Sequence, residues 1–218
     1  MLGVMTDPAP VTVPDAPEVA REVFGDRLAL AEAFAAELAD TGVSHGLIGP
    51  REVPRLWDRH VLNCAVPAVV IPEGSRIVDV GSGAGLPGIA MAIARPDLDV
   101  VLVEPMLRRT TWLSETIARL GLERVEVVRG RAEDVAGSVS APIVTARAVA
   151  RIDKLARWCV PLLDRPGRIV ALKGRSARAE LAEETAVLRR LGMTAGGVHE
   201  VGDGILEETT LVMDLRFG

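Results

Sequence analysis

Residues 76–105 read RIVDVGSGAGLPGIAMAIARPDLDVVLVEP, and this stretch decides the fold. One apolar run, 77–80, leads into a glycine-rich turn, and a second apolar run, 100–103, ends at Glu104. Between the two runs, Pro87 stands where a first helical turn can begin, because the missing N–H of proline costs nothing there. The stretch therefore predicts strand, turn, helix and strand within about thirty residues, the size of one βαβ unit.

The turn and the two strand ends predict a site for a ligand that contains a nucleoside. Glycines let the backbone approach a ligand closely, and a carboxylate at the end of the next strand can accept hydrogen bonds from ribose hydroxyls. The candidate binding residues of this unit are Asp79, Gly81, Gly83, Gly85 and Glu104.

The position of the acid distinguishes two kinds of cofactor. Read from Gly83, the letters GAGLPG match the G-x-G-x-x-G pattern of dinucleotide sites, but counted from Gly81 the third glycine position holds Leu86. Asp79 lies two residues before Gly81, and a pyrophosphate favours helix N–H groups without a carboxylate beside them. S-adenosylmethionine has no phosphate and carries an ammonium and a sulfonium, which suit that acid. The pattern favours S-adenosylmethionine, with a nicotinamide dinucleotide or a turn without ligand as the alternatives.

Composition and charge limit the class of protein. The chain has 218 residues, which suits one domain with an extension. Its net charge is −5, so contact with nucleic acid requires a local basic patch. Cys64 and Cys159 show no metal-ligand spacing, and no apolar run reaches about 18 residues, so we expect a cytoplasmic protein without a metal or a membrane segment.

We expect three parts along the chain: a loose, proline-bearing tail over 1–17, a helical cap over 18–72 and an α/β domain over 73–218. Apolar residues at helical spacing predict two cap helices, at 18–40 and at about 51–64.

After Glu104 strands and helices continue to alternate. The last two expected strands, 194–201 and 209–216, are joined by a turn too short for a crossover helix, so they should be antiparallel neighbours. Five strands with crossovers followed by such a pair resemble the seven-stranded, Rossmann-like sheet of class I S-adenosylmethionine-dependent methyltransferases.

Polar residues at the other strand ends are further candidates, because ligands of open parallel sheets bind beyond the carboxyl ends of the strands. Ala132 and Glu133, in an expected polar loop, can hold an adenine edge, although Glu133 is equally suited to a helix start. Arg147 follows a strand and begins a basic run with Arg151 and Lys154. The run is either a solvated basic helix start or, because cations stand at the wrong end of a helix for its dipole, a site for an anionic partner such as a phosphate backbone. His60, beside Arg59, is either a substrate contact or a satisfied, partly buried histidine.

Missing motifs narrow the chemistry. No Pro-Cys pair offers a nucleophile for pyrimidine C5, and no Asn/Asp-Pro-Pro-aromatic run follows the fourth strand. The remaining residues suit a nucleophile that needs no deprotonation, such as a purine ring nitrogen. For that reaction the main task of the protein is to align the nitrogen, the methyl group and the sulfur.

Several collinear stretches are similar to the bacterial 16S ribosomal RNA guanine-N7 methyltransferases, the glucose-inhibited division protein B family. They are LWDRHVLNC at 56–64, IVDVGSGAGLPGI at 77–89, LVEPMLRRTTWL at 102–113, GRAEDV at 130–135, TARAVARI at 145–152 and ALKG at 171–174. One departure is GVSHGLIGP at 42–50, which lacks the Trp-Asn and Asn-Leu-Thr elements of many relatives, so the resemblance implies the cofactor site but no contacts for this part of the cap.

The resemblance implies a role for each matching residue. The cofactor is S-adenosylmethionine, and its contacts are Gly81, Leu86, Ala132 and Glu133, with Glu104 at the ribose and Arg147 closing the site. Arg59, His60 and Lys173 match positions near the RNA or the target base. We expect Arg147, His60 and Lys173 to act in catalysis.

The implied substrate is the decoding region of 16S RNA within a small ribosomal subunit or its assembly intermediate, and we expect a monomer. Two alternatives are an NAD(P)-dependent oxidoreductase and a non-enzymatic ribosome-assembly or RNA-binding factor.

Overall fold

The computed structural model describes residues 13–147 and 150–218, and their strands form one seven-stranded sheet. The spatial order is β3-β2-β1-β4-β5-β7-β6. The strands are β1 (Arg76–Val80), β2 (Asp99–Glu104), β3 (Val125–Arg129), β4 (Ala141–Arg147), β5 (Leu163–Lys173), β6 (Met193–Val201) and β7 (Thr210–Phe217). β7 pairs antiparallel with both β5 and β6, whereas β1 to β5 pair in parallel, which confirms the expected sheet.

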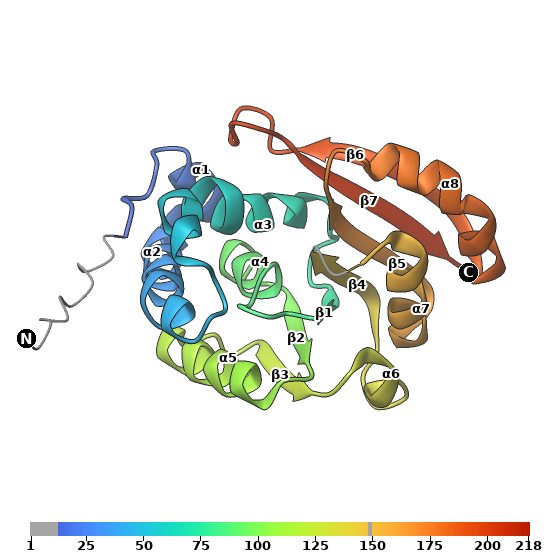
Figure 1. Cartoon of the computed structure of the whole chain (residues 1–218), viewed down its shortest axis with the longest axis horizontal. Coiled ribbons are helices and arrows are strands. Elements are labelled where there is room, and N and C mark those ends of the chain that lie inside the picture. Colours follow the sequence, from blue (N-terminus) through green and yellow to red (C-terminus); the bar gives the residue numbers. More distant parts are fainter. Residues whose placement is uncertain (1–12, 148–149) are drawn as a thin grey trace, which may run out of the picture.

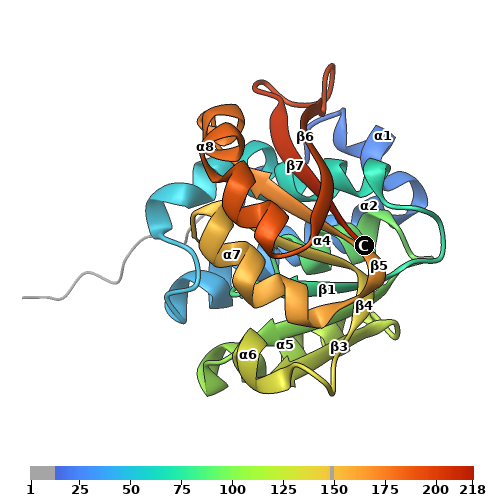
Figure 2. The same ribbon diagram turned by 90° about the vertical axis from the view of Figure 1, so that its right-hand side faces the viewer.

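Helices cover both faces of the sheet, as the apolar runs of its central strands require. Ile77 of β1 packs on one face with α4 (Gly88–Ala94) and α5 (Leu107–Leu120). Val78, its neighbour, packs on the other face with the three helices of the second half of the chain. These are α6 (Ala132–Val135), α7 (Ile152–Cys159) and α8 (Ala177–Arg190). Figures 1 and 2 show the two helical layers on either side of the strands.

The cap is helical, but neither of its expected helices is one regular α-helix. The first is divided into α1 (Ala20–Phe24) and α2 (Leu28–Glu37) by a 3₁₀ turn that starts at Gly25, where φ is +51°. A backbone angle in that region ends an α-helix and favours glycine. The stretch 38–42 then continues α2 as a π-helical turn.

The second expected cap helix changes hydrogen-bonding pattern twice. Residues 50–55 are 3₁₀-helical around Pro54, residues 56–62 are π-helical, and α3 (Asn63–Ala65) is a single α turn. A proline has no N–H to give to the helix ladder, so an unbroken α-helix is not available across Pro54.

The cap packs on the same face of the sheet as α4 and α5. Phe34 and Trp112 are both fully buried members of one hydrophobic cluster that also contains Ile77. Trp57 Nε1 donates to the Pro14 carbonyl at 2.9 Å. Residues 13–17, the end of the expected tail, have no helix or strand, and residues 1–12 of that tail lie outside the described part. The division at residues 17 and 72 stays a prediction.

One local expectation differs from the structure. The expected polar loop after β3 contains the one-turn helix α6, which places the side chains of 132 and 135 inward.

Within the described residues, no helix is long and apolar enough to cross a bilayer.

Candidate functional site

The glycine-rich loop between β1 and α4 has a backbone that other residues adopt only with strain. Gly81, Gly83 and Gly85 have φ values of +72°, +55° and +78°. A Cβ at Gly85 would overlap Ile89 Cδ1, and one at Gly88 would overlap Leu102 Cδ2. The glycines therefore serve both the turn and the close packing of α4 on the sheet.

Asp79 lies beneath this loop and is completely buried. Its Oδ2 accepts the Gly88 N–H at 3.0 Å, whereas its Oδ1 has no hydrogen-bond partner. Burial raises the pKa of the Asp79 carboxyl to about 7, against the opposing effect of the Gly88 hydrogen bond. The first N–H of α4 thus faces a carboxylate.

Glu104 ends β2 and is also buried, with its oxygens turned toward the glycine loop. Oε2 accepts the Gly83 N–H at 3.1 Å, and Oε1 accepts the Met106 N–H at 3.0 Å. Arg109 Nη1 lies 3.6 Å from Oε2. Glu104 is therefore next to the loop, as expected, but its oxygens are already shared among groups of the chain.

Arg147, at the end of β4, contacts the cap rather than an acid. Its Nη1 donates to the Arg59 carbonyl at 3.2 Å, and its Nη2 lies 3.2 Å from His60 Nδ1. His60 Nε2 lies 2.9 Å from Glu52 Oε2. Burial, reinforced by the Arg147 charge, lowers the pKa of the His60 imidazole. His60 is thus buried and hydrogen-bonded through both ring nitrogens, and the substrate contact expected of it stays a prediction.

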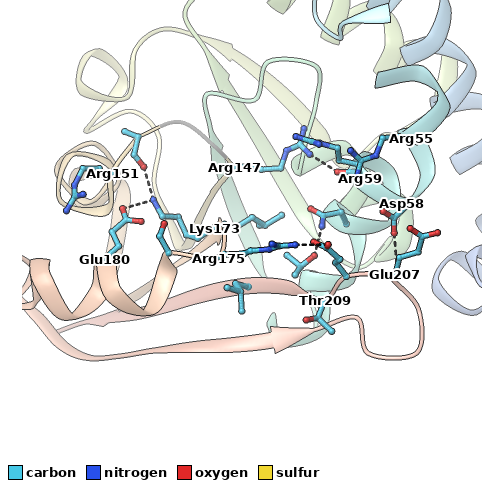
Figure 3. A pocket seen from close by; sticks show the side chains of 18 residues that line it. Arg55, Asp58, Arg59, Arg147, Arg151, Lys173, Arg175, Glu180, Glu207 and Thr209 are labelled. Carbon is cyan, nitrogen blue, oxygen red and sulfur yellow. Dashed lines mark hydrogen bonds and ion pairs between the residues drawn. The ribbon is translucent and has the colours of Figure 1, made fainter. Parts of the chain in front are cut away.

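Two cavities meet at Arg147 and Arg59, which line both of them. The first, the loop cavity, has about 430 Å³ and lies between the cap and the glycine loop. Its wall contains Leu47, Ile48, Gly49, Glu52, His60, Gly81, Ser82, Gly83, Ala84 and Leu86. The second, the basic cavity, has about 770 Å³ and opens beyond β4 and β5 (Figure 3).

Lys173 lines the basic cavity, but its ammonium is engaged. Nζ lies 2.8 Å from Glu180 Oε1 and donates to the Ala150 carbonyl at 2.8 Å. Glu180 also accepts the Ile152 N–H. Figure 3 shows Lys173 and Glu180 facing each other across the gap from Arg147. The structure thus places Lys173 in an ion pair that joins β5 to α7 and α8.

Other expected residues lie outside the loop cavity. Ala132 is buried in α6, and the next residue, Glu133, is exposed; neither lines the loop cavity. In the basic run after β4, Arg151 contacts two glutamates of α8, at 2.8 and 2.9 Å. Arg175, beyond β5, contacts Glu208 at 2.7 Å.

Sequence reasoning placed Arg59 and His60 of the cap at this site but missed the other cap residues that line it. The segment 47–49 and Glu52 form the wall opposite the glycines. Asn63 Nδ2 donates to Thr210 Oγ1 at 2.6 Å and so ties α3 to the start of β7 at the edge of the basic cavity. The apolar stripe that predicted the cap helix gives no signal for these contacts, because they depend on how the cap folds back.

The loop cavity fits S-adenosylmethionine better than a dinucleotide. Its volume is within the range of small-molecule sites. A pyrophosphate would need the N-terminus of α4, where the buried Asp79 already accepts the Gly88 N–H. Asp79, Gly85 and Glu104 do not line the loop cavity: the two carboxyls lie behind its glycines, bonded to the N–H groups of Gly83 and Gly88, and the carboxylate in its wall is that of Glu52.

Comparison with known proteins agrees with this geometry. The family model GidB, described as rRNA small subunit methyltransferase G, matches residues 27–208. The chain belongs to the GidB family. Proteins named Ribosomal RNA small subunit methyltransferase G include one from Salinispora arenicola, 55% identical over 96% of this chain and 90% of the relative. Another, from Streptomyces avermitilis, is 53% identical over 94% of this chain and 87% of the relative.

Solved structures of lower identity show the fold of this GidB-family chain. A SAM-dependent methyltransferase from Aquifex aeolicus superposes with a TM-score of 0.55 at 17% identity, over 78% of this chain and 100% of that one. M. jannaschii TYW2 in complex with AdoMet gives a TM-score of 0.54 at 19% identity, over 69% and 72% of the two chains. The fold is that of class I S-adenosylmethionine-dependent methyltransferases.

Proposed function

We propose that this chain transfers a methyl group from S-adenosylmethionine to N7 of a guanine in small-subunit ribosomal RNA. The names of its relatives support ribosomal RNA of the small subunit as substrate. The motifs at 77–89 and 145–152 support the guanine-N7 reaction, because they match the family to which that reaction belongs.

The observation that carries the proposal is the position of Arg147 on the wall between two cavities. On one side lies the glycine loop, where the cofactor supplies a methyl group on a positively charged sulfur. On the other side lies a larger cavity whose lining has six basic residues against four acidic ones, an excess of positive charge that suits the phosphates of an RNA chain. The basic residues are Arg55, Arg59, Arg147, Arg151, Lys173 and Arg175, and the acidic ones are Asp58, Glu180, Glu207 and Glu208.

The chain has mainly to align the reactants. N7 of guanine carries a lone pair, so no residue needs to remove a proton from it, and holding base and donor in line supplies much of the rate. In this proposal Gly81 and Leu86 form the floor of the cofactor site, and Glu104 binds the ribose after giving up its contact with Arg109. Arg147 separates the two reactants.

The remaining predicted contacts have less support from the geometry. Ala132 and Glu133 can contact the adenine only if the cofactor extends beyond the loop cavity. Lys173 can contact RNA only if its ion pair with Glu180 opens. We propose that Lys173 acts by holding Ala150, to whose carbonyl it donates. We further propose that the protein works as a monomer in the cytoplasm on an assembled or assembling small subunit.

The test is transfer of labelled methyl from S-adenosylmethionine to small subunits that lack the modification, followed by mapping of the labelled nucleotide. Label at guanine N7 supports the proposal, and label elsewhere or none contradicts it. Arg147→Met should abolish transfer, while Arg124→Met, which removes an exposed arginine paired with Asp99 instead, should not. Calorimetry with NAD and NADP tests the oxidoreductase alternative, which requires tight dinucleotide binding and no binding of S-adenosylmethionine.

A further inference from the structure

Arg147 is held by uncharged acceptors. Its guanidinium contacts the Arg59 carbonyl and the His60 imidazole, and no carboxylate of the described residues lies within ion-pair distance of it. Its charge is thus available to ligands of the two cavities, and its position depends on those two acceptors.

The contact with Arg147 determines the protonation of His60. A guanidinium can only donate hydrogen bonds, so His60 Nδ1, 3.2 Å from Arg147 Nη2, must be the acceptor. In a neutral imidazole the other nitrogen then carries the proton. His60 Nε2 therefore donates to Glu52 Oε2, at 2.9 Å.

Glu52 is suited to hold that tautomer. Its carboxylate accepts hydrogen bonds only, and the bond from His60, with the nearby Arg59 charge, keeps the pKa of Glu52 below its usual value. Arg59 Nε lies 3.2 Å from the same oxygen, Oε2, so Glu52 contacts both cap residues that hold Arg147. A protonated imidazole would lose the Arg147 bond, since both of its nitrogens would donate.

We propose that Glu52 is a positioning residue for methyl transfer, because it fixes His60 in the tautomer that holds Arg147 between the two cavities. This role rests on the proposed function. Glu52 acts through His60 and not by contact with the reacting atoms, so its loss should affect turnover more than cofactor binding.

The kinetic test compares variants at Glu52 in two backgrounds. Glu52→Ala should lower kcat about 10- to 100-fold through displacement of Arg147, with a much smaller change in KM for S-adenosylmethionine. Glu52→Gln, whose amide oxygen can accept the same bond, should stay closer to the wild type. Glu37→Ala is the matched control, because it removes a cap carboxylate that pairs with Arg119 away from both cavities.

The second background is His60→Asn. The asparagine oxygen can take the place of Nδ1 and accept from Arg147, but the shorter side chain no longer reaches Glu52. Glu52→Ala should therefore have a much smaller effect on kcat in that background, what remains acting through Arg59, whose carbonyl also holds Arg147. An equal loss of kcat in both backgrounds would overturn the proposal, because Glu52 would then act independently of His60.

A proton signal tests the contact without any activity. The chain has three histidines, so the loss of one downfield, slowly exchanging N–H signal in His60→Asn identifies the Nε2–H of His60. That signal should disappear in Glu52→Ala and move upfield in Glu52→Gln, since a neutral acceptor makes a weaker bond. An unchanged signal in Glu52→Ala overturns the proposal. A wild type that binds S-adenosylmethionine but methylates no RNA refutes the proposed function instead, and the positioning role with it.

Discussion

Replacement of Asp79 by asparagine should remove a pH dependence of stability that the buried carboxyl produces. The shape of the side chain is kept, and the amide oxygen can still accept the Gly88 N–H. In the folded chain the pKa of Asp79 is raised from 3.8 to about 7, chiefly by burial. Between these two values the folded state binds more protons than the unfolded state, so stability falls as the pH rises.

The magnitude follows from the two pKa values. At pH 5 the unfolded carboxyl is mostly ionised while the folded one is still protonated, and at pH 8 both are ionised. From pH 5 to pH 8 the free energy of unfolding of the wild type should therefore fall by about 2 to 3 kcal/mol more than that of Asp79→Asn. Urea unfolding at a series of pH values, followed by circular dichroism without cofactor, measures this difference.

Asp97→Asn provides the matched control. Asp97 is paired with Arg95, whose hydrogen bonds hold the pKa of that carboxyl far below its ordinary value. Its contribution to stability is present above pH 4 and is lost only in more acid solution. Asp97→Asn should thus lower stability equally at pH 5 and pH 8. Parallel curves for the wild type and Asp79→Asn over that range would refute the reasoning, since they would mean that Asp79 is ionised in the folded protein at pH 5.

Three further changes test the packing around the site. Gly88→Ala should destabilise the protein by about 1 to 3 kcal/mol in urea unfolding, because its Cβ overlaps Leu102 and lies 2.8 Å from Asp79 Oδ2. Gly121→Ala should lower the free energy of unfolding by only about 1 kcal/mol in the same assay, because its backbone is left-handed helical (φ +63°, ψ +36°) and nothing lies within 4 Å of a Cβ there. A loss at Gly88 no larger than the loss at Gly121 would contradict the overlap. Glu180→Ala should lower the free energy of unfolding by about 3 to 5 kcal/mol, because it leaves Lys173 charged and buried without a partner. Adding Lys173→Met should restore much of that stability. A double variant no more stable than the single one would show that the buried charge is not the cause.

The sequence predicts the sheet and the glycine loop because both depend on neighbours along the chain. Apolar runs that are buried on both faces, such as 77–80 and 100–103, have few other solutions than parallel strands. Strand ends at one edge must lie near one another, which is why the sequence by itself predicts Gly81 and Arg147 in one site.

The cap could not be predicted to the same degree. Helical spacing identifies which side of a segment is buried, but it does not distinguish α, 3₁₀ and π turns, and the actual pattern around Pro54 depends on packing against α4 and the sheet. The pairing of Glu52 with His60 joins different turns of that irregular helix. The partner of Lys173 was missed for a similar reason: Glu180 reaches it only after the chain has turned through 174–176 into α8.

The shared wall at Arg147 and Arg59 has a consequence for how ligands influence each other. A ligand that restrains either side chain from one cavity changes the shape and the charge that the other cavity presents. The two effects are thermodynamically reciprocal: if the methyl donor raises the affinity for RNA by some factor, RNA raises the affinity for the donor by the same factor. The demethylated cofactor lacks the positive charge on sulfur, so its coupling to RNA should differ from that of the donor.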